Sequence, residues 1–387
     1  MTEKNTCPAC NSADVAPFLS RSGVPVFQNW PLESEEQARR VTRGDLSFSA
    51  CNRCGFVFNS AFDPNLVAYG EQYDNSQQHS EFFSEYMSGL VDHIIDECGV
   101  KDAKIVEVGC GKGAFLRALV SRADANNTAI GFDTSYQGDK QYFEGRLRFE
   151  SSYYDKNSGC RPDVVVSRHV IEHVSNPAEF LQSIRASLND VPHARLFLET
   201  PCVEWILRNK VAWDFFYEHC SLFTSESLSS LVTASGFTVQ SVEHLFGGQY
   251  LWLEAVVGNE TAIPVYDPGG IPLLAEEYSL YECAYKAGWD KRLEEYLGKG
   301  AVCLWGAGAK GVTFANLVDA GCNSICCVVD VNENKQGKYL PGTGHSIVAP
   351  DRLDSFGVRT TILMNPNYRE EVERILLQTG QDIEIVS

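Results

Sequence analysis

Short apolar segments alternate with segments of helical periodicity along most of the chain. Runs of β-branched and aromatic residues end at a charged or polar position, and a glycine turn or a helical pattern follows them. The strand-like runs are Lys104–Val108, Ala129–Phe132, Leu147–Glu150, Val164–Val166, Arg195–Leu198, Ala301–Trp305 and Ile325–Val329. Unbroken apolar runs are typical of parallel strands that are buried on both faces. The pattern therefore predicts an α/β protein with doubly wound parallel sheets.

Shifts in this pattern divide the chain. Residues 1–61 hold short strand-like runs at Val24–Asn29 and Leu46–Ala50, and residues 62–100 form an aromatic-rich linking segment that ends in a helix from about Ser80 to Cys98. The remaining parts are a central domain at 101–257, a bridge with prolines and an acidic helix at 258–300, and a last domain at 301–387. We therefore expect a small N-terminal domain followed by two α/β domains.

Composition narrows the class of partner. The net charge of −19 argues against nucleic acid or an anionic membrane as partner, because either needs a basic face. No apolar run reaches the ~18 residues of a membrane span. The first ten residues do not resemble a signal peptide, so we expect a cytoplasmic protein. Its partner should be a small molecule, and it should be a monomer or a homodimer.

Two cysteine pairs share a C-x-x-C spacing. Cys7 and Cys10 open the chain, and Cys51 and Cys54 follow about forty residues later. Such pairs, each beside turn-forming residues, have the spacing of a tetrahedral four-cysteine zinc site. Four cysteines leave no open position for a substrate, so the zinc should be structural. The alternative is two unrelated redox or core pairs.

A glycine-rich turn follows the first strand of the central domain. Glu107 precedes Gly109, Gly111 and Gly113, and a helical pattern follows. The backbone N–H groups of such a turn can approach a ligand that carries a negative group. Glu107 would repel a pyrophosphate but suits a ligand with a cation. Asp133 ends the next strand, where a carboxylate can accept hydrogen bonds from ribose hydroxyls. A glycine turn of another α/β fold is the alternative.

Histidines stand at two chemically suggestive places. Arg168 and His169 follow a buried strand, and ligands of doubly wound sheets bind outside the carboxyl ends of strands. His173 lies four residues later, and we expect it to be structural. His219 follows Tyr217 and Glu218, and a histidine with a carboxylate close by can act as a general base. Adjacent side chains do not necessarily meet, so this spacing alone favours a structural His219.

The last domain opens with a dinucleotide fingerprint. Gly306, Gly308 and Gly311 give G-x-G-x-x-G after a strand, and Asp330 ends the next strand. On spacing alone an NAD-linked enzyme is a rival interpretation. The lysines that stand out in this acidic domain can hold the phosphates of a nucleotide-linked substrate or simply be solvated. They are Lys310, Lys335 and Lys338.

The Glu107–Gly113 turn with Asp133 resembles the motifs of class I S-adenosylmethionine (SAM) methyltransferases. The order of the parts resembles the three-domain sugar C-methyltransferases, which act on nucleotide-linked keto-sugars. The resemblance implies structural zinc and SAM as cofactors. The residues that it implies for SAM are Glu107, Gly109, Gly111, Asp133 and Arg168. It further implies His219 as the base that forms an enolate, with Glu218 and His169 stabilising the enolate or orienting the sugar, Tyr73 closing the site, and Tyr217, Lys310, Lys335 and Lys338 binding substrate.

Two departures limit the resemblance. Gly308 stands where the family tends to have proline, and Phe216 stands where a catalytic tyrosine is expected. The interpretation is nevertheless a SAM-dependent C-methyltransferase with a nucleotide-linked keto-sugar as substrate. The rivals are an O-methyltransferase on a related substrate, an NAD-dependent sugar-modifying enzyme that uses Gly306–Gly311, and a zinc-ribbon binding module with a degenerate methyltransferase fold.

Overall fold

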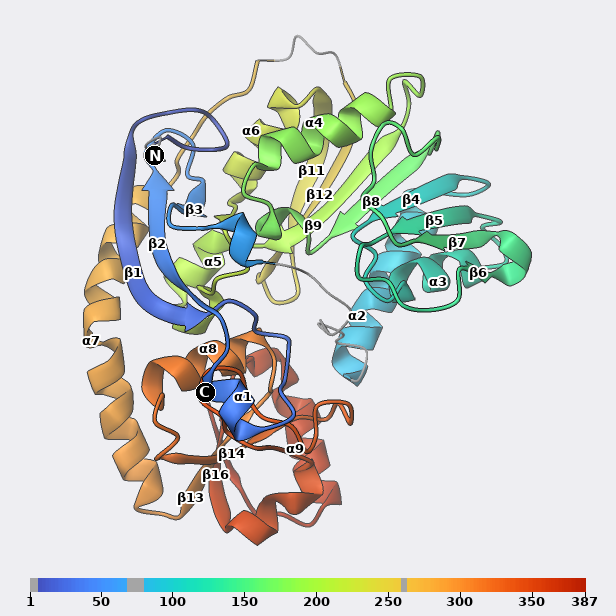
Figure 1. The fold of residues 1–387 in the computed structure, drawn as a ribbon. Coiled ribbons are helices and arrows are strands. Elements are labelled where there is room, and N and C mark those ends of the chain that lie inside the picture. The colour runs from blue at the N-terminus through green and yellow to red at the C-terminus, as the bar shows by residue number, and fades with distance from the viewer. Residues whose placement is uncertain (1–5, 68–79, 259–262) are drawn as a thin grey trace.

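The computed structural model describes residues 6–67, 80–258 and 263–387, and Figure 1 shows their arrangement. The N-terminal sheet has the order β1-β2-β3-β10, with β1 (Val15–Pro25), β2 (Arg43–Cys51) and β3 (Val57–Asn59) antiparallel. Strand β10 (Ser221–Leu222) joins it from much later in the chain. The strand expected at 24–29 overlaps β1 only at Val24 and Pro25, the last two residues of β1, because the chain leaves the sheet after Pro25.

The central sheet is doubly wound. Its order is β11-β12-β9-β8-β4-β5-β7-β6, and β7, β5, β4, β8 and β9 run parallel. Strand β4 lies between β5 and β8, so the topological switch point is at the end of β4. The strands are β4 (Lys104–Val108), β5 (Thr128–Phe132), β6 (Gln141–Tyr142), β7 (Leu147–Glu150), β8 (Val164–Arg168), β9 (Arg195–Pro201), β11 (Phe237–Leu245) and β12 (Tyr250–Val257).

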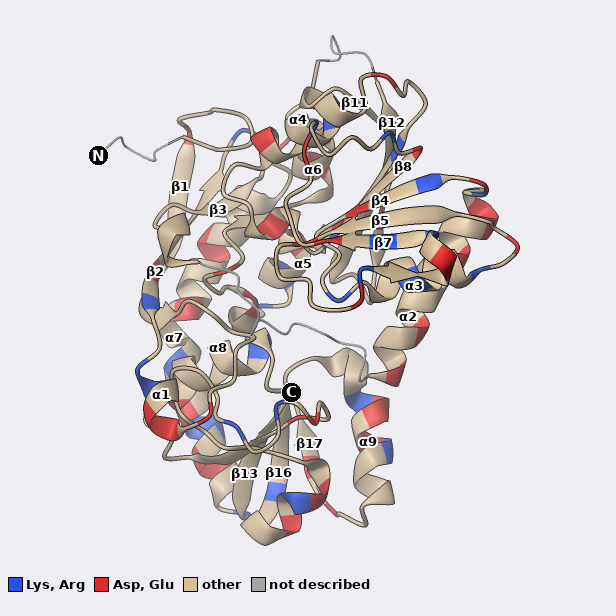
Figure 2. Ribbon diagram, turned by 45° about the vertical axis from the view of Figure 1, so that its right-hand side comes forward, with Lys and Arg blue, Asp and Glu red and all other residues tan. Residues whose placement is uncertain are grey.

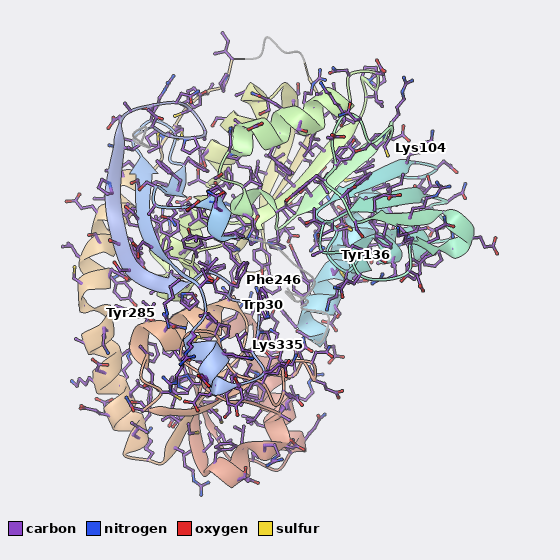
Figure 3. All side chains as sticks on the ribbon, in the orientation of Figure 1. Trp30, Lys104, Tyr136, Phe246, Tyr285 and Lys335 are labelled. Atoms are coloured by element: carbon purple, nitrogen blue, oxygen red, sulfur yellow. The ribbon has the colours of Figure 1, made fainter. Side chains whose placement is uncertain are left out.

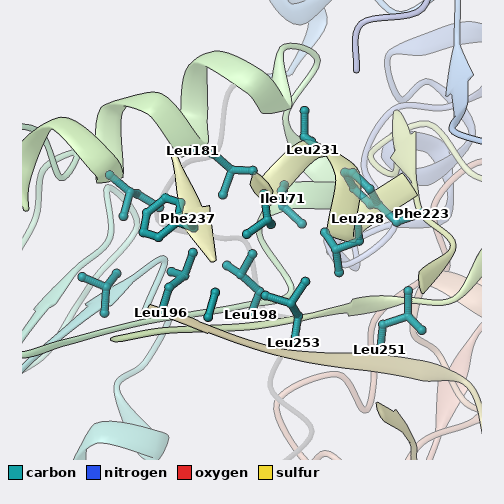
Figure 4. Packing of buried hydrophobic residues seen from close by; sticks show 14 of the residues in the cluster. Ile171, Leu181, Leu196, Leu198, Phe223, Leu228, Leu231, Phe237, Leu251 and Leu253 are labelled. Atoms are coloured by element: carbon teal, nitrogen blue, oxygen red, sulfur yellow. The ribbon is translucent and has the colours of Figure 1, made fainter. Parts of the chain in front are cut away.

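Helices cover both faces of the central sheet. One face packs α4 (Pro177–Ser187) and α6 (Ser225–Ala234), and the other packs α2 (Glu81–Asp92) and α3 (Ala114–Ser121). Thr224 forms the N-cap of α6, in a capping box with Ser227. Figure 4 shows how leucines of the two helices on the first face meet leucines of the sheet: Leu181, Leu228, Leu231, Leu196, Leu198, Leu251 and Leu253.

The C-terminal sheet is entirely parallel, with the order β15-β14-β13-β16-β17. Strand β13 lies between β14 and β16, so its end is a second switch point. The elements are β13 (Ala301–Trp305), α8 (Ala309–Val318), β14 (Ile325–Val329), β15 (Ile347–Val348), β16 (Val358–Leu363), α9 (Arg369–Gln378) and β17 (Glu384–Val386). The remaining short helices are α1 (Glu35–Arg39) and α5 (Val203–Arg208).

One long helix joins the parts. Helix α7 (Ile271–Leu297) packs Tyr278 against the N-terminal sheet and Tyr285 and Trp289 against the C-terminal sheet, so it runs along the side of the molecule (Figure 1). Acidic and basic positions are mixed on the outer helices α1 and α9 (Figure 2). Within the described ranges, no helix combines the length and the apolar character needed to cross a membrane.

Candidate active site

A cavity of about 300 Å³ lies between the central and C-terminal sheets. It opens where the carboxyl ends of β8 and β9 face those of β13, β14 and β16. Figure 3 labels two residues at this junction, Phe246 and Lys335, of which Lys335 lines the cavity. The polar and aromatic residues that line it include Asn29, His169, Glu172, His173, Asp214, Phe216, His219, Gln249, Tyr250, Lys310, Asp330, Asn332, Lys335 and Asn365. The carboxyl-end edges of the two sheets therefore share one cavity, which is the position expected of a ligand site.

His219 lies in the loop between α5 and β10. Its ring packs on Phe216 at a centroid distance of 4.0 Å and edge-on against His173 at 4.8 Å. Burial, together with the positive charge of His173, His169 and Lys310, lowers the pKa of His219 well below its ordinary value. Its Nδ1 atom makes no hydrogen bond to the part of the chain that the structure describes. The lowered pKa keeps the imidazole in its neutral form at neutral pH.

His169 has the opposite electrostatic environment. It follows β8 with φ of +54°, a strained left-handed conformation of the kind that collects at functional sites. Its Nδ1 lies 3.3 Å from Glu172 Oε1, and its Nε2 lies 3.6 Å from Glu199 Oε2. Burial opposes charge on this ring, but the two carboxylates outweigh it and raise the pKa of His169. Protonated His169 can therefore donate a hydrogen bond.

The predicted cofactor residues of the glycine turn after β4 lie outside the cavity lining, at the switch point of the central sheet. Gly109, Gly111 and Gly113 have φ values of +74°, +51° and +74°, which explains why glycine stands at each. A Cβ atom at Gly111 would meet nothing within 4 Å, so the turn is open there. Asp133 accepts a hydrogen bond from the Gly111 amide at 2.8 Å. Glu107 is buried, and burial raises its pKa to about 8.

Arg168 occupies a buried polar network beside this turn. Its Nε donates to Glu199 Oε2 at 2.6 Å, and the Tyr86 hydroxyl of α2 donates to the other oxygen of Glu199. Burial opposes ionisation of Glu199, but Arg168 and His169 lower its pKa. Among the described residues, Arg168 Nη2 and Glu107 Oε2 are buried without a hydrogen-bond partner. SAM carries an ammonium and a carboxylate, so an unpaired acid and an unpaired guanidinium nitrogen fit its methionine part.

The C-terminal wall supplies two lysines. Lys310 Nζ donates to Asp214 Oδ2 at 2.8 Å and lies 3.4 Å from Gln249 Oε1. Lys335 Nζ lies 3.7 Å from Asp330 Oδ2. The Asp330 carboxylate also accepts hydrogen bonds from the amides of residues 307 and 332, at 2.8 Å each. Lys310 and Lys335 both line the cavity, as does the N-terminus of α8.

Several of the predicted site residues lie away from the cavity lining. The Tyr217 hydroxyl accepts a hydrogen bond from the Asp63 amide at 2.9 Å. Glu218 is buried, and its Oε2 accepts from the Gln28 amide at 2.9 Å. Lys338 forms an ion pair with Glu33 at 3.1 Å. Tyr73 lies outside the described residues.

Sequence reasoning missed a hydrogen-bond network across the domain junction. Gln249 and Asn365 exchange side-chain hydrogen bonds of 2.9 and 3.1 Å, and Lys310 joins them to Asp214. Asn365 closely follows β16, so its place at the carboxyl end of a parallel strand was a usable signal. Gln249 and Asp214 lie in connecting segments, where the sequence pattern gives no such signal.

The four N-terminal cysteines converge. Cys7 Sγ lies 3.7 Å from Cys54 Sγ, and Cys10 Sγ lies 3.6 Å from Cys51 Sγ. Sulfur atoms on a tetrahedral zinc ion are about 3.8 Å apart, so the four thiols fit such an ion. In the cavity, Glu172, His173 and His219 also place ligand atoms within 4.8 Å of one another and can hold a metal ion.

Comparison with known proteins agrees with this architecture. A family model described as a methyltransferase domain matches residues 81–242, and one described as a C-methyltransferase C-terminal domain matches residues 286–382. The C-methyltransferase NovU of Streptomyces niveus is 25% identical over 97% of this chain and 93% of its own length. A mitochondrial ubiquinone biosynthesis O-methyltransferase of Schizosaccharomyces pombe is 33% identical, but only over 25% of this chain and 37% of its own.

A solved structure of a Burkholderia thailandensis 1,6-didemethyltoxoflavin N1-methyltransferase is 15% identical. The match covers 47% of this chain and 88% of the chain of that structure. Its TM-score of 0.36 is too low to support an assignment. The assignment rests on the order of the two matched domains and on the near full-length match to a C-methyltransferase. The chain is a SAM-dependent methyltransferase, and its two matched domains and its match to NovU are consistent with the three-domain C-methyltransferase family.

Proposed function

We propose that this enzyme methylates the carbon next to the ketone of a nucleotide-linked keto-sugar. The observation that carries the proposal is the opposite electrostatics of two histidines in one cavity. Burial and positive neighbours lower the pKa of His219, whereas Glu199 and Glu172 raise the pKa of His169 against burial. Groups whose environments push their pKa values apart are suited to opposite roles in proton transfer.

The roles follow from the protonation states. Neutral His219 removes the proton from the carbon beside the ketone, and Nδ1, which lacks a partner among the described residues, is available to receive it. Protonated His169 donates a hydrogen bond to the enolate oxygen as negative charge develops on it. The enolate that remains is nucleophilic at carbon. When bound, SAM supplies the electrophilic methyl group.

The same chain holds the cofactor through Glu107, Asp133, Arg168 and the glycine turn. Glu107 would hold the ammonium of the cofactor and Arg168 its carboxylate, because Glu107 Oε2 and Arg168 Nη2 have no hydrogen-bond partner among the described residues, and the open backbone at Gly111 would admit the ligand. Tyr86 fixes Glu199, which in turn fixes Arg168. These buried contacts support a preorganised cofactor site beside the cavity.

The phosphate-binding part of the proposal rests on Lys310, Lys335 and the N-terminus of α8. These are positive groups in the cavity wall of a protein with a net charge of −19. A helix N-terminus beside lysines favours a phosphate group.

An NAD-linked role is less well supported. Lys335 Nζ lies 3.7 Å from Asp330 Oδ2, so a ribose would have to compete with this ion pair for the acid.

We also propose that Cys7, Cys10, Cys51 and Cys54 hold structural zinc. Their sulfur spacing and burial support this. The zinc would tie the segment before β1, which carries Cys7 and Cys10, to the end of β2 and the turn after it, which carry Cys51 and Cys54. No step of the reaction requires it.

The test separates proton removal from methyl transfer. The protein is incubated in D₂O with S-adenosylhomocysteine and each member of a panel of nucleotide-linked 4-keto-sugars, and deuterium incorporation next to the ketone is followed by NMR. We expect exchange in the wild type, none in His219→Ala, and equal S-adenosylhomocysteine affinity in both. Exchange that persists in the variant would remove His219 from the mechanism.

An O-methyltransferase remains the second candidate, because it can use the same base. The matched substrate is the sugar with the ketone reduced to a hydroxyl. Methyl transfer to the reduced sugar, with no exchange at carbon in the keto form, would favour the oxygen as the methylated atom.

A further inference from the structure

A second cluster of metal-ligating side chains lies outside the cavity, between the end of α2 and strand β12. His93 and Cys98 come from the chain after α2, and Glu254 comes from the middle of β12. Their ligand atoms all lie within 4.8 Å of one another. This brings an imidazole nitrogen, a thiol sulfur and a carboxylate together from two elements about 160 residues apart in sequence.

A local distortion of the helix brings the first two donors together. Residues His93–Glu97 form a π-helical turn, in which the Cys98 amide donates to the His93 carbonyl at 2.9 Å. In a regular α-helix, side chains five positions apart point about 140° away from each other. The wider turn places them on the same side, and Cys98 Sγ lies 3.5 Å from His93 Nε2. Such single π turns are frequent at functional sites.

The donor spacing suits a zinc ion. On a tetrahedral zinc ion, a sulfur and a nitrogen or oxygen ligand are about 3.6 Å apart. Cys98 Sγ lies 3.5 Å from His93 Nε2 and 3.5 and 3.6 Å from the two Glu254 oxygens. His93 Nε2 and Glu254 Oε1 are hydrogen-bonded at 2.6 Å, so they must separate to about 3.3 Å to share an ion.

The surroundings also fit a metal ligand set. Glu97 Oε2 lies 2.8 Å from His93 Nδ1, the outer carboxylate–histidine pairing that orients zinc-binding imidazoles. A thiolate and the Glu254 carboxylate together balance the charge of a divalent ion. Arg195 lies 3.6 Å from the second oxygen of Glu254 and keeps that atom paired. The His93 and Glu254 side chains are 26% and 14% exposed, so an ion can reach them from solvent.

We propose that His93, Cys98 and Glu254 form a second zinc site, with water as the fourth ligand. The ion fastens the end of α2 to β12. Because α2 also carries Tyr86 to Glu199, this fixes the helix that supports the cofactor site. The site takes no part in the proposed methyl transfer, so its test does not depend on the substrate.

The first experiment counts zinc in the purified full-length protein by mass spectrometry after desalting. We expect Cys98→Ser and Glu254→Gln each to lose about one zinc per chain relative to the wild type. The matched control is Cys283→Ser, which removes an exposed thiol and should leave the zinc content unchanged. Circular dichroism and thermal unfolding establish that each variant is folded. Unchanged zinc content in both folded variants would overturn the proposal.

A second measurement needs no variant. Crystals of the wild type, grown with a small molar excess of zinc, are measured on both sides of the zinc absorption edge. An anomalous peak among His93, Cys98 and Glu254 would support the site. Its absence would leave His93 as a cation paired with Glu97 and Glu254, and the proposal would be wrong.

Discussion

The raised pKa of Glu107 predicts that cofactor binding releases a proton. Burial holds the pKa of this carboxyl at about 8, so most of the ligand-free protein carries a proton on Glu107 at pH 7. A ligand ammonium group favours the ionised carboxylate, so binding must first remove that proton. The apparent dissociation constant is then multiplied by about 100 at pH 6, about 11 at pH 7 and about 2 at pH 8.

The assay is calorimetric titration with S-adenosylhomocysteine between pH 6 and pH 8, in buffers of different ionisation enthalpy. Affinity should rise about 50-fold across this range, and about 0.9 proton should be released per ligand at pH 7. Glu107→Gln should bind more weakly at pH 8 and release no proton. Asp133→Asn is the matched control, because it weakens binding but keeps the release. A wild-type affinity that is independent of pH, without proton release, would refute the reasoning.

Three further predictions concern stability, inhibition by zinc and zinc content. Glu107→Gln should raise the free energy of unfolding of the ligand-free protein at pH 7 by about 3 kcal/mol. The pKa of Glu107 is higher in the folded than in the unfolded protein, so ionisation of the unfolded chain above pH 4.5 opposes folding. Denaturant unfolding of both proteins at pH 5 and pH 7 measures this difference. Added Zn²⁺ should inhibit turnover reversibly by occupying Glu172, His173 and His219 in the cavity, measured as initial rates against free zinc. Cys51→Ser should lower zinc content and solubility, and full zinc retention would contradict the four-cysteine site.

The periodic pattern predicted most of the fold. The five parallel strands of the central sheet, strands β13 and β14 of the C-terminal sheet, and helix α2 lie where the apolar runs placed them, because buried strands between helices leave a strong local signal. Strands β15, β16 and β17 of the C-terminal sheet were not predicted. The N-terminal sheet was harder to predict. Its last strand, β10, comes from residues 221–222 and pairs with β3, a contact between distant parts of the chain. The π-helical turn at His93 was also hidden, since its sequence fits a regular helix equally well.

The positions of site residues at the ends of strands could be predicted from the sheet topology. The side-chain directions of site residues in loops could not, because tertiary packing determines them. Arg168 and His169 end a strand at a switch point, so their neighbourhood followed from the sheet order. Glu218 and His219 are adjacent in sequence, yet only His219 lines the cavity, while the Glu218 carboxylate binds the Gln28 amide. The direction of each side chain depends on the N-terminal sheet packed behind this loop, which no local pattern encodes.

The junction of the two α/β domains explains why one chain needs both fingerprints. The glycine turn after β4 lies near Arg168 and is open at Gly111, whereas Gly306–Gly311 lines the cavity with Lys310 and the N-terminus of α8. Lys310 also holds Asp214, five residues before His219 on the same loop. A phosphate that draws Lys310 away from Asp214 would therefore act on the segment that carries the proposed base. Substrates without the nucleotide should accordingly lose turnover number as well as affinity, which kcat and KM measured with the free keto-sugar would reveal.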